Sequence, residues 1–235
     1  MFSSAQSRHD DSMSSILRGS APDSRATLRR LALGAVSLGS ILVVGYSVAI
    51  VESGFRLLPG EVAANGVPQL VWVHVVLSTA ALLLMPLQLS TRVRERHSRI
   101  HRVSGRTYVV CAISGGIFGA LAAITTANGL IAGAGFFTLA VAWVGSTVAT
   151  IVCARAGSIN AHRKWAIRSA SLVFAGVTLR LELGLGVALT GASFAVVYSV
   201  AAWLCWIPNL AVAEWLHRRR RDYPFGKRPV TSSFA

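Results

Sequence analysis

The stretch GAGFFTLAVAWVGSTVATIVCAR, residues 133–155, carries no charge before its last residue, Arg155. About 20 apolar residues in a helix span the hydrocarbon core of a bilayer, because each residue adds about 1.5 Å. Five further runs of comparable hydropathy follow the same pattern, at 31–51, 70–90, 105–127, 165–190 and 194–216. We therefore expect an all-α fold, a polytopic transmembrane helical bundle with six spans.

The composition agrees with a membrane protein. Of the 235 residues 53% are hydrophobic and only 14% are charged, whereas a soluble domain carries roughly 25% charged residues. This excludes a disordered chain, a collagen and a disulfide scaffold. The three cysteines, Cys111, Cys153 and Cys205, lie in predicted spans or at the end of one, so we expect them to be ordinary small apolar residues.

The net charge of +14 raises the alternative of nucleic-acid binding. However, 21 of the 23 basic residues fall into four clusters separated by pairs of apolar spans, which is the positive-inside pattern of cytoplasmic segments. The clusters are Arg8, Arg18, Arg25, Arg29 and Arg30; Arg92, Arg94, Arg96, Arg99, Arg102 and Arg106; Arg155, Arg163, Lys164 and Arg168; and Arg218 to Arg221 with Lys227 and Arg228. We expect no nucleic-acid partner.

The same pattern predicts the organisation of the chain. Residues 1–30 are expected to form a flexible cytoplasmic tail, 31–216 the six-helix transmembrane domain, and 217–235 a basic cytoplasmic tail. No signal peptide is evident, since the first apolar run is as long as a full span. Both termini are therefore expected in the cytoplasm, with the protein in the cell membrane.

Polar side chains within the spans are costly unless they are paired or hydrated. His74 lies near the outer end of the second span, in one helical stripe with Ser78, Met85 and Gln88. Arg180 and Glu182 lie at a similar depth on the fifth span and must face different ways, since residues two apart are separated by about 200°. Either both extend to the headgroups, or one of them forms an outer polar site with His74.

A second group of polar residues is expected at the inner face. His101 and His162 each precede a span that starts on the cytoplasmic side, so they could approach one another. His97 and His101 have a spacing seen in metal sites, but five arginines within residues 92–102 disfavour a divalent cation. We predict no metal site. Anionic lipid headgroups of the bilayer are the expected partner here.

Two sequence features concern the helices themselves. Gly115 and Gly119 form a small-xxx-small ridge that allows close packing of another helix. Pro208, followed by Asn209, lies inside the last span and removes a backbone donor. A kink is the favoured consequence, and a broken helix that lines a site is the alternative.

Several of these residues recur in one arrangement: His74, Gln88, HRVSGRTY at 101–108, the segment from Gly135 through Trp143, HRKWAIRS at 162–169 and TLR at 178–180. The arrangement, over roughly residues 70–185, resembles domain-of-unknown-function family 2306, predicted bacterial multi-pass membrane proteins. The resemblance implies a helical membrane fold and a bacterial plasma membrane, and no established activity. The family often has Met where Ala166 stands, and Glu182 is atypical of it.

The sequence thus predicts a membrane protein of uncharacterised function, not a self-contained enzyme, with an intramembrane His/Arg site and an inner basic site. One alternative is a b-type haem protein for electron transfer, with His101 and His162 as axial ligands and arginines at the propionates. The other is a transporter of a small molecule or lipid. The candidate ligand or cofactor residues are His74, Gln88, His101, Arg106, His162, Arg168 and Arg180.

Overall fold

The computed structural model describes residues 24–52 and 68–221. The chain divides into two compact units, Met1–Val36 and Ser37–Ala235. In the first unit the described residues are the beginning of helix α2, which runs over Ser24–Glu52. The second unit contains the rest of α2 and all later described helices. In these described ranges there are nine helices and no strand, which confirms the all-α prediction.

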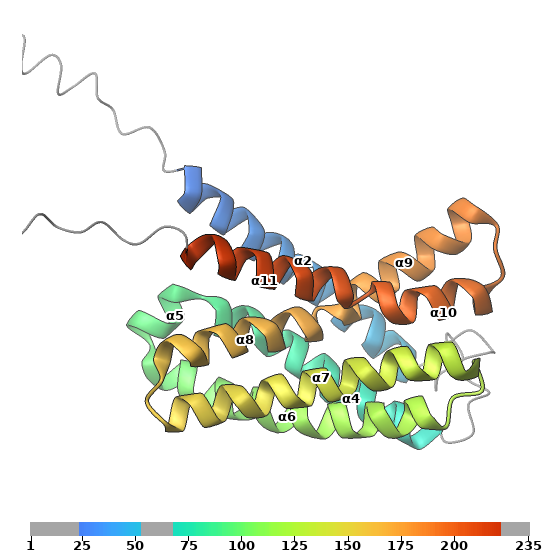
Figure 1. Cartoon of the computed structure of the whole chain (residues 1–235), viewed down its shortest axis with the longest axis horizontal. Coiled ribbons are helices and arrows are strands. Elements are labelled where there is room, and N and C mark those ends of the chain that lie inside the picture. The colour runs from blue at the N-terminus through green and yellow to red at the C-terminus, as the bar shows by residue number, and fades with distance from the viewer. Residues whose placement is uncertain (1–23, 53–67, 222–235) are drawn as a thin grey trace, which may run out of the picture. The chain divides into compact units, whose positions relative to one another are not determined.

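The helices of the second unit follow the predicted spans closely (Figure 1). They are α4 (Pro68–Leu89), α5 (Thr91–Arg96), α6 (Ser98–Ile124), α7 (Gly129–Arg155), α8 (Ile159–Val173), α9 (Ala175–Thr190), α10 (Phe194–Leu204) and α11 (Ile207–Arg221). Five helical segments among the described residues are long and apolar enough to cross a membrane, and Leu33–Ala49 in α2 is a shorter apolar stretch. The chain is therefore a helical membrane protein with about six spans.

The first residues of helix α2 belong to the segment 1–30, which was expected to be a flexible tail. Helix α2 begins at Ser24, so residues 24–30 are helical, while residues 1–23 lie outside the described residues. The sequence RATLRR consists mostly of good helix formers, and adding such residues to an existing helix is inexpensive. The absence of apolar periodicity led to the expectation of a flexible tail, but it does not indicate where the helix begins.

The segment between the second and third spans contains a short helix that the sequence analysis did not predict. In α5 the hydroxyl of Ser90 accepts a hydrogen bond from the backbone N–H of Val93 at 3.3 Å and caps the helix. Helix α6 then begins at Ser98, earlier than the predicted start at 105. His101 and the arginines before the apolar span are thus themselves helical, while His97 separates α5 from α6.

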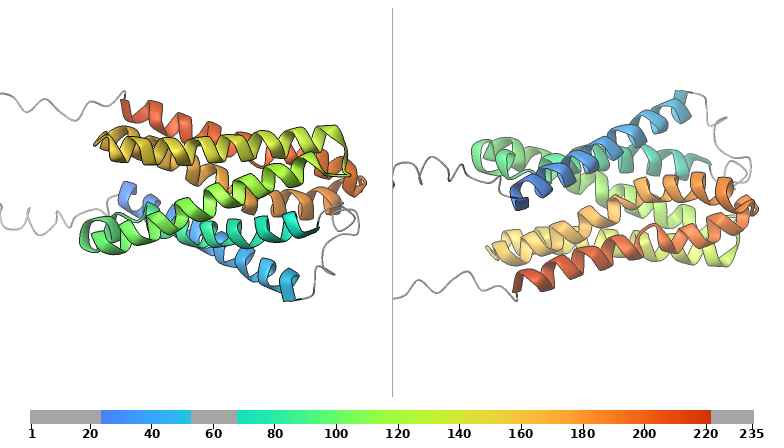
Figure 2. Two further views of the ribbon diagram at one scale, coloured as in Figure 1. Left: turned by 90° about the horizontal axis from the view of Figure 1, so that it is seen from below. Right: turned by 90° about the horizontal axis from the view of Figure 1, so that it is seen from above.

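Helices of the second unit pack through small residues. Helix α4 lies along α6, α6 along α7, and α7 along α8, while α10 contacts α7 and α9, and α11 contacts α8 (Figure 2). Ala81, Ala112, Ala132 and Ala202 are completely buried, whereas Leu130 and Leu189 are 89% and 79% exposed. Small residues inside and large apolar residues outside are typical of helices that pack in lipid, where large side chains lose nothing by exposure.

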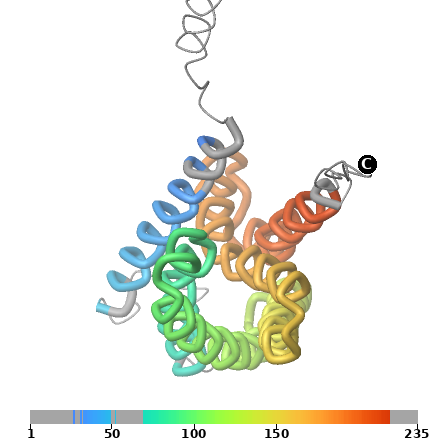
Figure 3. Tube along the Cα trace, turned by 90° about the vertical axis from the view of Figure 1, so that its left-hand side faces the viewer, coloured from blue at the N-terminus to red at the C-terminus, as the bar shows by residue number. Residues whose placement is uncertain are grey.

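Three of the basic clusters come together at one end of the second unit, which is called the basic end below (Figures 1 and 3). It consists of α5 with the start of α6, the connection from α7 to α8, and the last described turns of α11. The opposite end has the α6–α7 connection and the turn from α9 to α10. Gly191 closes α9 there with a left-handed backbone, φ 64°, which glycine adopts without strain.

The last two spans are both broken near their middle. The fifth consists of α8 and α9, separated at Phe174, and the sixth of α10 and α11, separated at Cys205 and Trp206. Pro208 lies in the first turn of α11, so the sequence correctly indicated an irregularity there. The two breaks lie against each other, because Thr178 Oγ1 donates to the carbonyl of Cys205 at 2.5 Å.

Candidate functional site

The polar residues of α8 and α9 lie on two faces that meet different neighbours. On one face Ser169 contacts residues of α6 and α7, and Arg180 lies toward α2 and α4. On the other face Arg168 contacts α11, and Thr178 contacts the break between α10 and α11. This confirms that Arg180 and Glu182 do not share a face. It also separates the polar residues of the bundle into several distinct places.

Arg180 is held inside the bundle by its own helix. Its Nη1 donates to the carbonyl of Gly176 at 2.7 Å, one turn earlier in α9, and its guanidinium carbon lies 5.7 Å from the centre of the Tyr46 ring. Its Nε is buried and has no hydrogen-bond partner among the described residues. The nearer end of the span is at Thr190, about 15 Å from Arg180 along the helix axis. The guanidinium points back along α9 and therefore away from that end.

His74 lies close enough to Arg180 for an electrostatic interaction. Its Nδ1 donates to the carbonyl of Gly115 at 2.8 Å, with the Ser78 hydroxyl 3.3 Å from the same nitrogen. This fixes the tautomer, since a carbonyl only accepts, and leaves Nε2 as an acceptor while the ring is neutral. The contacts of Nδ1 hold the His74 ring in place within the range of the Arg180 charge, and we call His74, Ser78 and Arg180 the His74–Arg180 site.

Gly119 on α6 provides the space for the imidazole. A Cβ at this position would lie 2.6 Å from Nδ1 and 2.8 Å from Cε1 of His74. Any side chain here would therefore force the ring to move. The small-residue ridge that the sequence suggested as a packing surface thus holds a functional candidate in place.

Gln88 lies toward the basic end of α4 and is bound to α6. Its Nε2 donates to Ser104 Oγ at 2.6 Å and to the carbonyl of His101 at 3.4 Å. Gly105 leaves room for it, since a Cβ there would lie 3.0 Å from Gln88 Oε1. Gln88 is thus far along α4 from His74 and does not belong to the His74–Arg180 site.

His101 and His162 both lie at the basic end. They lie close enough to interact electrostatically, and Arg94 and Arg102 act on His101 in the same way. His162 Nδ1 donates to the carbonyl of Thr150 at 3.0 Å, which orients the ring and leaves Nε2 as its acceptor nitrogen. His101 Nδ1 is buried without a partner in the part of the chain that the structure describes.

The remaining two candidates do not join this histidine pair. Arg168 forms a two-bond ion pair with Glu214 of α11, with Nη2 3.0 Å from Oε2, and stacks 4.3 Å above the ring of Trp165. Its charge is therefore already neutralised by an acid that the sequence analysis did not connect to it. Arg106 is exposed on α6. The seven candidates thus form no single site.

The sequence analysis missed a buried hydroxyl network between α6, α7 and α8. Ser169 Oγ lies 2.8 Å from both Tyr108 Oη and Thr147 Oγ1, and Trp143 Nε1 donates to Tyr108 Oη at 3.4 Å. Tyr108, Trp143 and Ser169 are the last residues of three of the segments on which the family resemblance rests. The signal was therefore present, but it marks packing of the bundle and not a ligand site.

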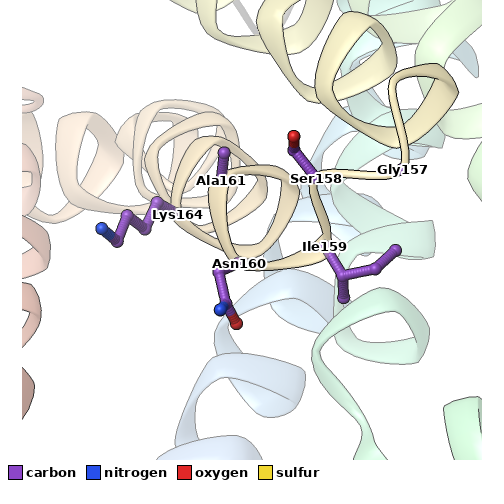
Figure 4. A pocket seen from close by; sticks show the side chains of 6 residues that line it. All are labelled: Gly157, Ser158, Ile159, Asn160, Ala161 and Lys164. Carbon is purple, nitrogen blue, oxygen red and sulfur yellow. The ribbon is translucent and has the colours of Figure 1, made fainter.

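A surface hollow at the basic end involves none of the predicted residues. It is lined by Gly157, Ser158, Ile159, Asn160, Ala161 and Lys164, at the turn into α8 (Figure 4). The side chains of Ser158, Asn160 and Lys164 point in different directions and do not converge on a common point (Figure 4). The hollow therefore offers no arrangement suited to a ligand.

Comparison with known proteins supports the membrane assignment. No curated protein and no solved structure matches the chain. A family described as predicted membrane proteins, DUF2306, matches residues 71–217, which is more than half of the 235 residues and includes both the His74–Arg180 site and the hydroxyl network. The chain therefore belongs to the DUF2306 family of predicted membrane proteins.

Proposed function

We propose that this multi-pass membrane protein binds an amphiphilic anion through Arg180 and His74. The observation that carries the proposal is the environment of Arg180, whose buried Nε has no partner among the residues described. Binding is the step that a transporter and a receptor of such a molecule would share.

No acidic side chain pairs with Arg180 in residues 24–52 and 68–221. Between residues 68 and 221 the two ion pairs are Arg94 with Glu95 and Arg168 with Glu214. Glu182, the nearest acid in sequence, is on the other face of α9. An uncompensated guanidinium within a span is costly. An anionic group would relieve this cost.

The geometry favours a carboxylate or phosphate on an apolar tail. A guanidinium has several N–H donors in a planar fork that suits such groups. Nε and Nη2 of Arg180 lie on one edge of that fork, while Nη1 donates to the Gly176 carbonyl. An anion bound beside His74 would favour protonation of the ring, and Nε2 would then add a donor. Because the site lies within apolar spans, the rest of the ligand is expected to be apolar.

We also propose an orientation of the protein in the membrane. The basic end would lie at the cytoplasmic face of a bacterial plasma membrane with both termini in the cytoplasm, as the positive-inside rule predicts. There Arg106 and the arginines of α5 would bind anionic headgroups, each cation near the surface contributing about 1 kcal/mol. Gln88, His101, His162 and the ion-paired Arg168 would support this end of the bundle.

A matched pair of ligands tests the intramembrane site. Purified protein in a neutral detergent is heated with laurate or with dodecanol, which have the same tail and differ in charge. We expect laurate to raise the unfolding temperature of the wild type and of Arg155→Gln, an exposed arginine at the end of α7. Arg180→Leu and His74→Ala should lose this response. Equal responses to both ligands, or an unchanged response in Arg180→Leu, would exclude the proposal.

The histidine pair supports a second candidate, a b-type haem protein. His101 and His162 lie close together, and the Nδ1 bond of His162 to the Thr150 carbonyl is the kind of contact that orients a histidine ligand. Nearby arginines suit haem propionates. The test is the absorption spectrum of protein purified from haem-replete cells. If haem binds here, the wild type has a Soret band that disappears in His162→Ala. Absence of the band from the wild type would exclude haem.

A further inference from the structure

Glu182 occupies a defined position between α9 and α10. Thr178, one turn before it, contacts the carbonyl of Cys205, and Gly186, one turn after it, abuts α10 so closely that a Cβ there would lie 2.6 Å from Val197 Cγ1. Residues 178, 182 and 186 share one helix face. Glu182 therefore faces α10 between Val197 and Cys205.

The wall that Glu182 meets is apolar and closely packed. Ala201, which lies one turn after Val197 and one turn before Cys205, is 2% exposed, and Cys205 is completely buried. Oε2 of Glu182 is itself buried and finds no hydrogen-bond partner within residues 24–52 and 68–221. A carboxylate oxygen in such surroundings is strongly destabilised, whereas a neutral carboxyl is tolerated much better.

The neighbouring groups do not supply a positive charge. The titratable groups on α10 and at its break are Tyr198, whose ring stacks on Phe194 with centroids 5.4 Å apart, and Cys205. On α8, Arg168 is paired with Glu214, and on α9 itself Arg180 lies on the opposite face. The C-terminal end of helix α10, at Leu204, adds the partial negative charge of the helix dipole to the surroundings of Glu182.

We propose that Glu182 is a proton-binding site within the membrane, at the junction of the two broken helices. A proton fits better than a metal cation, because the carbonyl of Cys205 at the break already accepts from Thr178 Oγ1 and from Asn209 Nδ2, the latter at 2.8 Å. Coordination of a metal cation would require this carbonyl oxygen as a ligand. The proton-binding site is separate from the His74–Arg180 site and does not depend on anion binding.

Infrared spectroscopy of the full-length protein tests this directly, because a protonated carboxyl has a C=O stretch that a carboxylate lacks. We expect this band at neutral pH in the wild type, its loss in Glu182→Gln, and its retention in Glu214→Gln, which removes an ion-paired carboxylate. A wild type without the band, or a band that persists in Glu182→Gln, would overturn the proposal.

Two further measurements keep the test decisive. If Glu182→Gln does not fold, Glu182→Asp retains a carboxyl in a different position, and the band should shift; an unshifted band argues that another carboxyl is its source. Exchange of sodium for choline in the buffer should leave the unfolding temperature of the wild type unchanged. A sodium-dependent increase that Glu182→Gln lacks would show a metal cation at the site in place of the proton.

Discussion

The hydroxyl oxygens of Tyr108 and Ser169 lie 2.8 Å apart and connect α6 to α8 inside the bundle. Ser169 also contacts Thr147 Oγ1, so Ser169→Ala would leave two buried hydroxyls without this partner. We expect it to lower the free energy of unfolding by about 1–3 kcal/mol. Thermal unfolding in detergent measures the effect. Ser171→Ala is the matched control, since its hydroxyl bonds only within α8, to the Arg168 carbonyl; equal losses in both variants would contradict the prediction.

Gly119→Ala should disturb the His74–Arg180 site selectively. The added methyl would meet the His74 imidazole at 2.6 Å, so the ring must move and its bond to the Gly115 carbonyl must weaken. We expect the laurate response of the unfolding temperature to decrease strongly. Gly145→Ala, on α7 where a Cβ meets nothing within 4 Å, should keep that response and stabilise its helix by about 0.5–1 kcal/mol. A full laurate response in Gly119→Ala would refute the assigned role of this glycine.

The pair of Arg168 and Glu214 should couple α8 to α11. Their side chains are 25% and 33% exposed, so solvent screens the interaction in part, and a coupling of about 1 kcal/mol is expected. A double-mutant cycle with Arg168→Gln and Glu214→Gln measures it from unfolding free energies. Arg94→Gln provides the comparison, because its contact with Glu95 is 3.6 Å long and Glu95 is 69% exposed. Additive effects in the cycle would show that the pair does not stabilise the bundle.

The orientation in the membrane can be tested by cysteine labelling. In a variant without Cys111, Cys153 and Cys205, single cysteines replace Arg99 at the basic end or Ser193 in the α9–α10 turn, both of which are exposed. An impermeant maleimide should label Ser193→Cys in intact cells and Arg99→Cys only after permeabilisation. The reverse pattern would place the basic end outside the cytoplasm.

The spans could be predicted because each depends on a local property, a run of apolar residues long enough for the bilayer. The break near Pro208 was predictable for the same reason, since a missing N–H acts within one turn. The break at Phe174 was not, because no proline stands there. The start of α6 and the helix α5, both at the basic end, were also not predicted. An arginine-rich segment outside the apolar span can still be helical.

The sequence could indicate which site residues lie near one another only where their depth in the membrane and their helix face determine it. Depth predicted His74 near Arg180 and His101 near His162, and in each pair the two side chains lie within electrostatic range of one another. Pairing of Arg168 with Glu214, 46 residues later, depends on which helices are neighbours, and one sequence does not contain that information. The sequence stripe of His74 and Gln88 likewise could not show that Gln88 bonds to α6.

Helix α9 has Arg180 on one face and Glu182 on the other, so the rotation of the helix about its axis determines where both side chains lie. A residue inserted or deleted between Phe174 and Thr178 would rotate everything beyond it by about 100°. Arg180 would then leave His74, and Glu182 would leave the small-residue wall of α10, so both polar side chains would be misplaced at once. Length changes in this segment should therefore be far more damaging than single substitutions, whereas the turn after Gly191, which separates α9 from α10, should accept inserted residues.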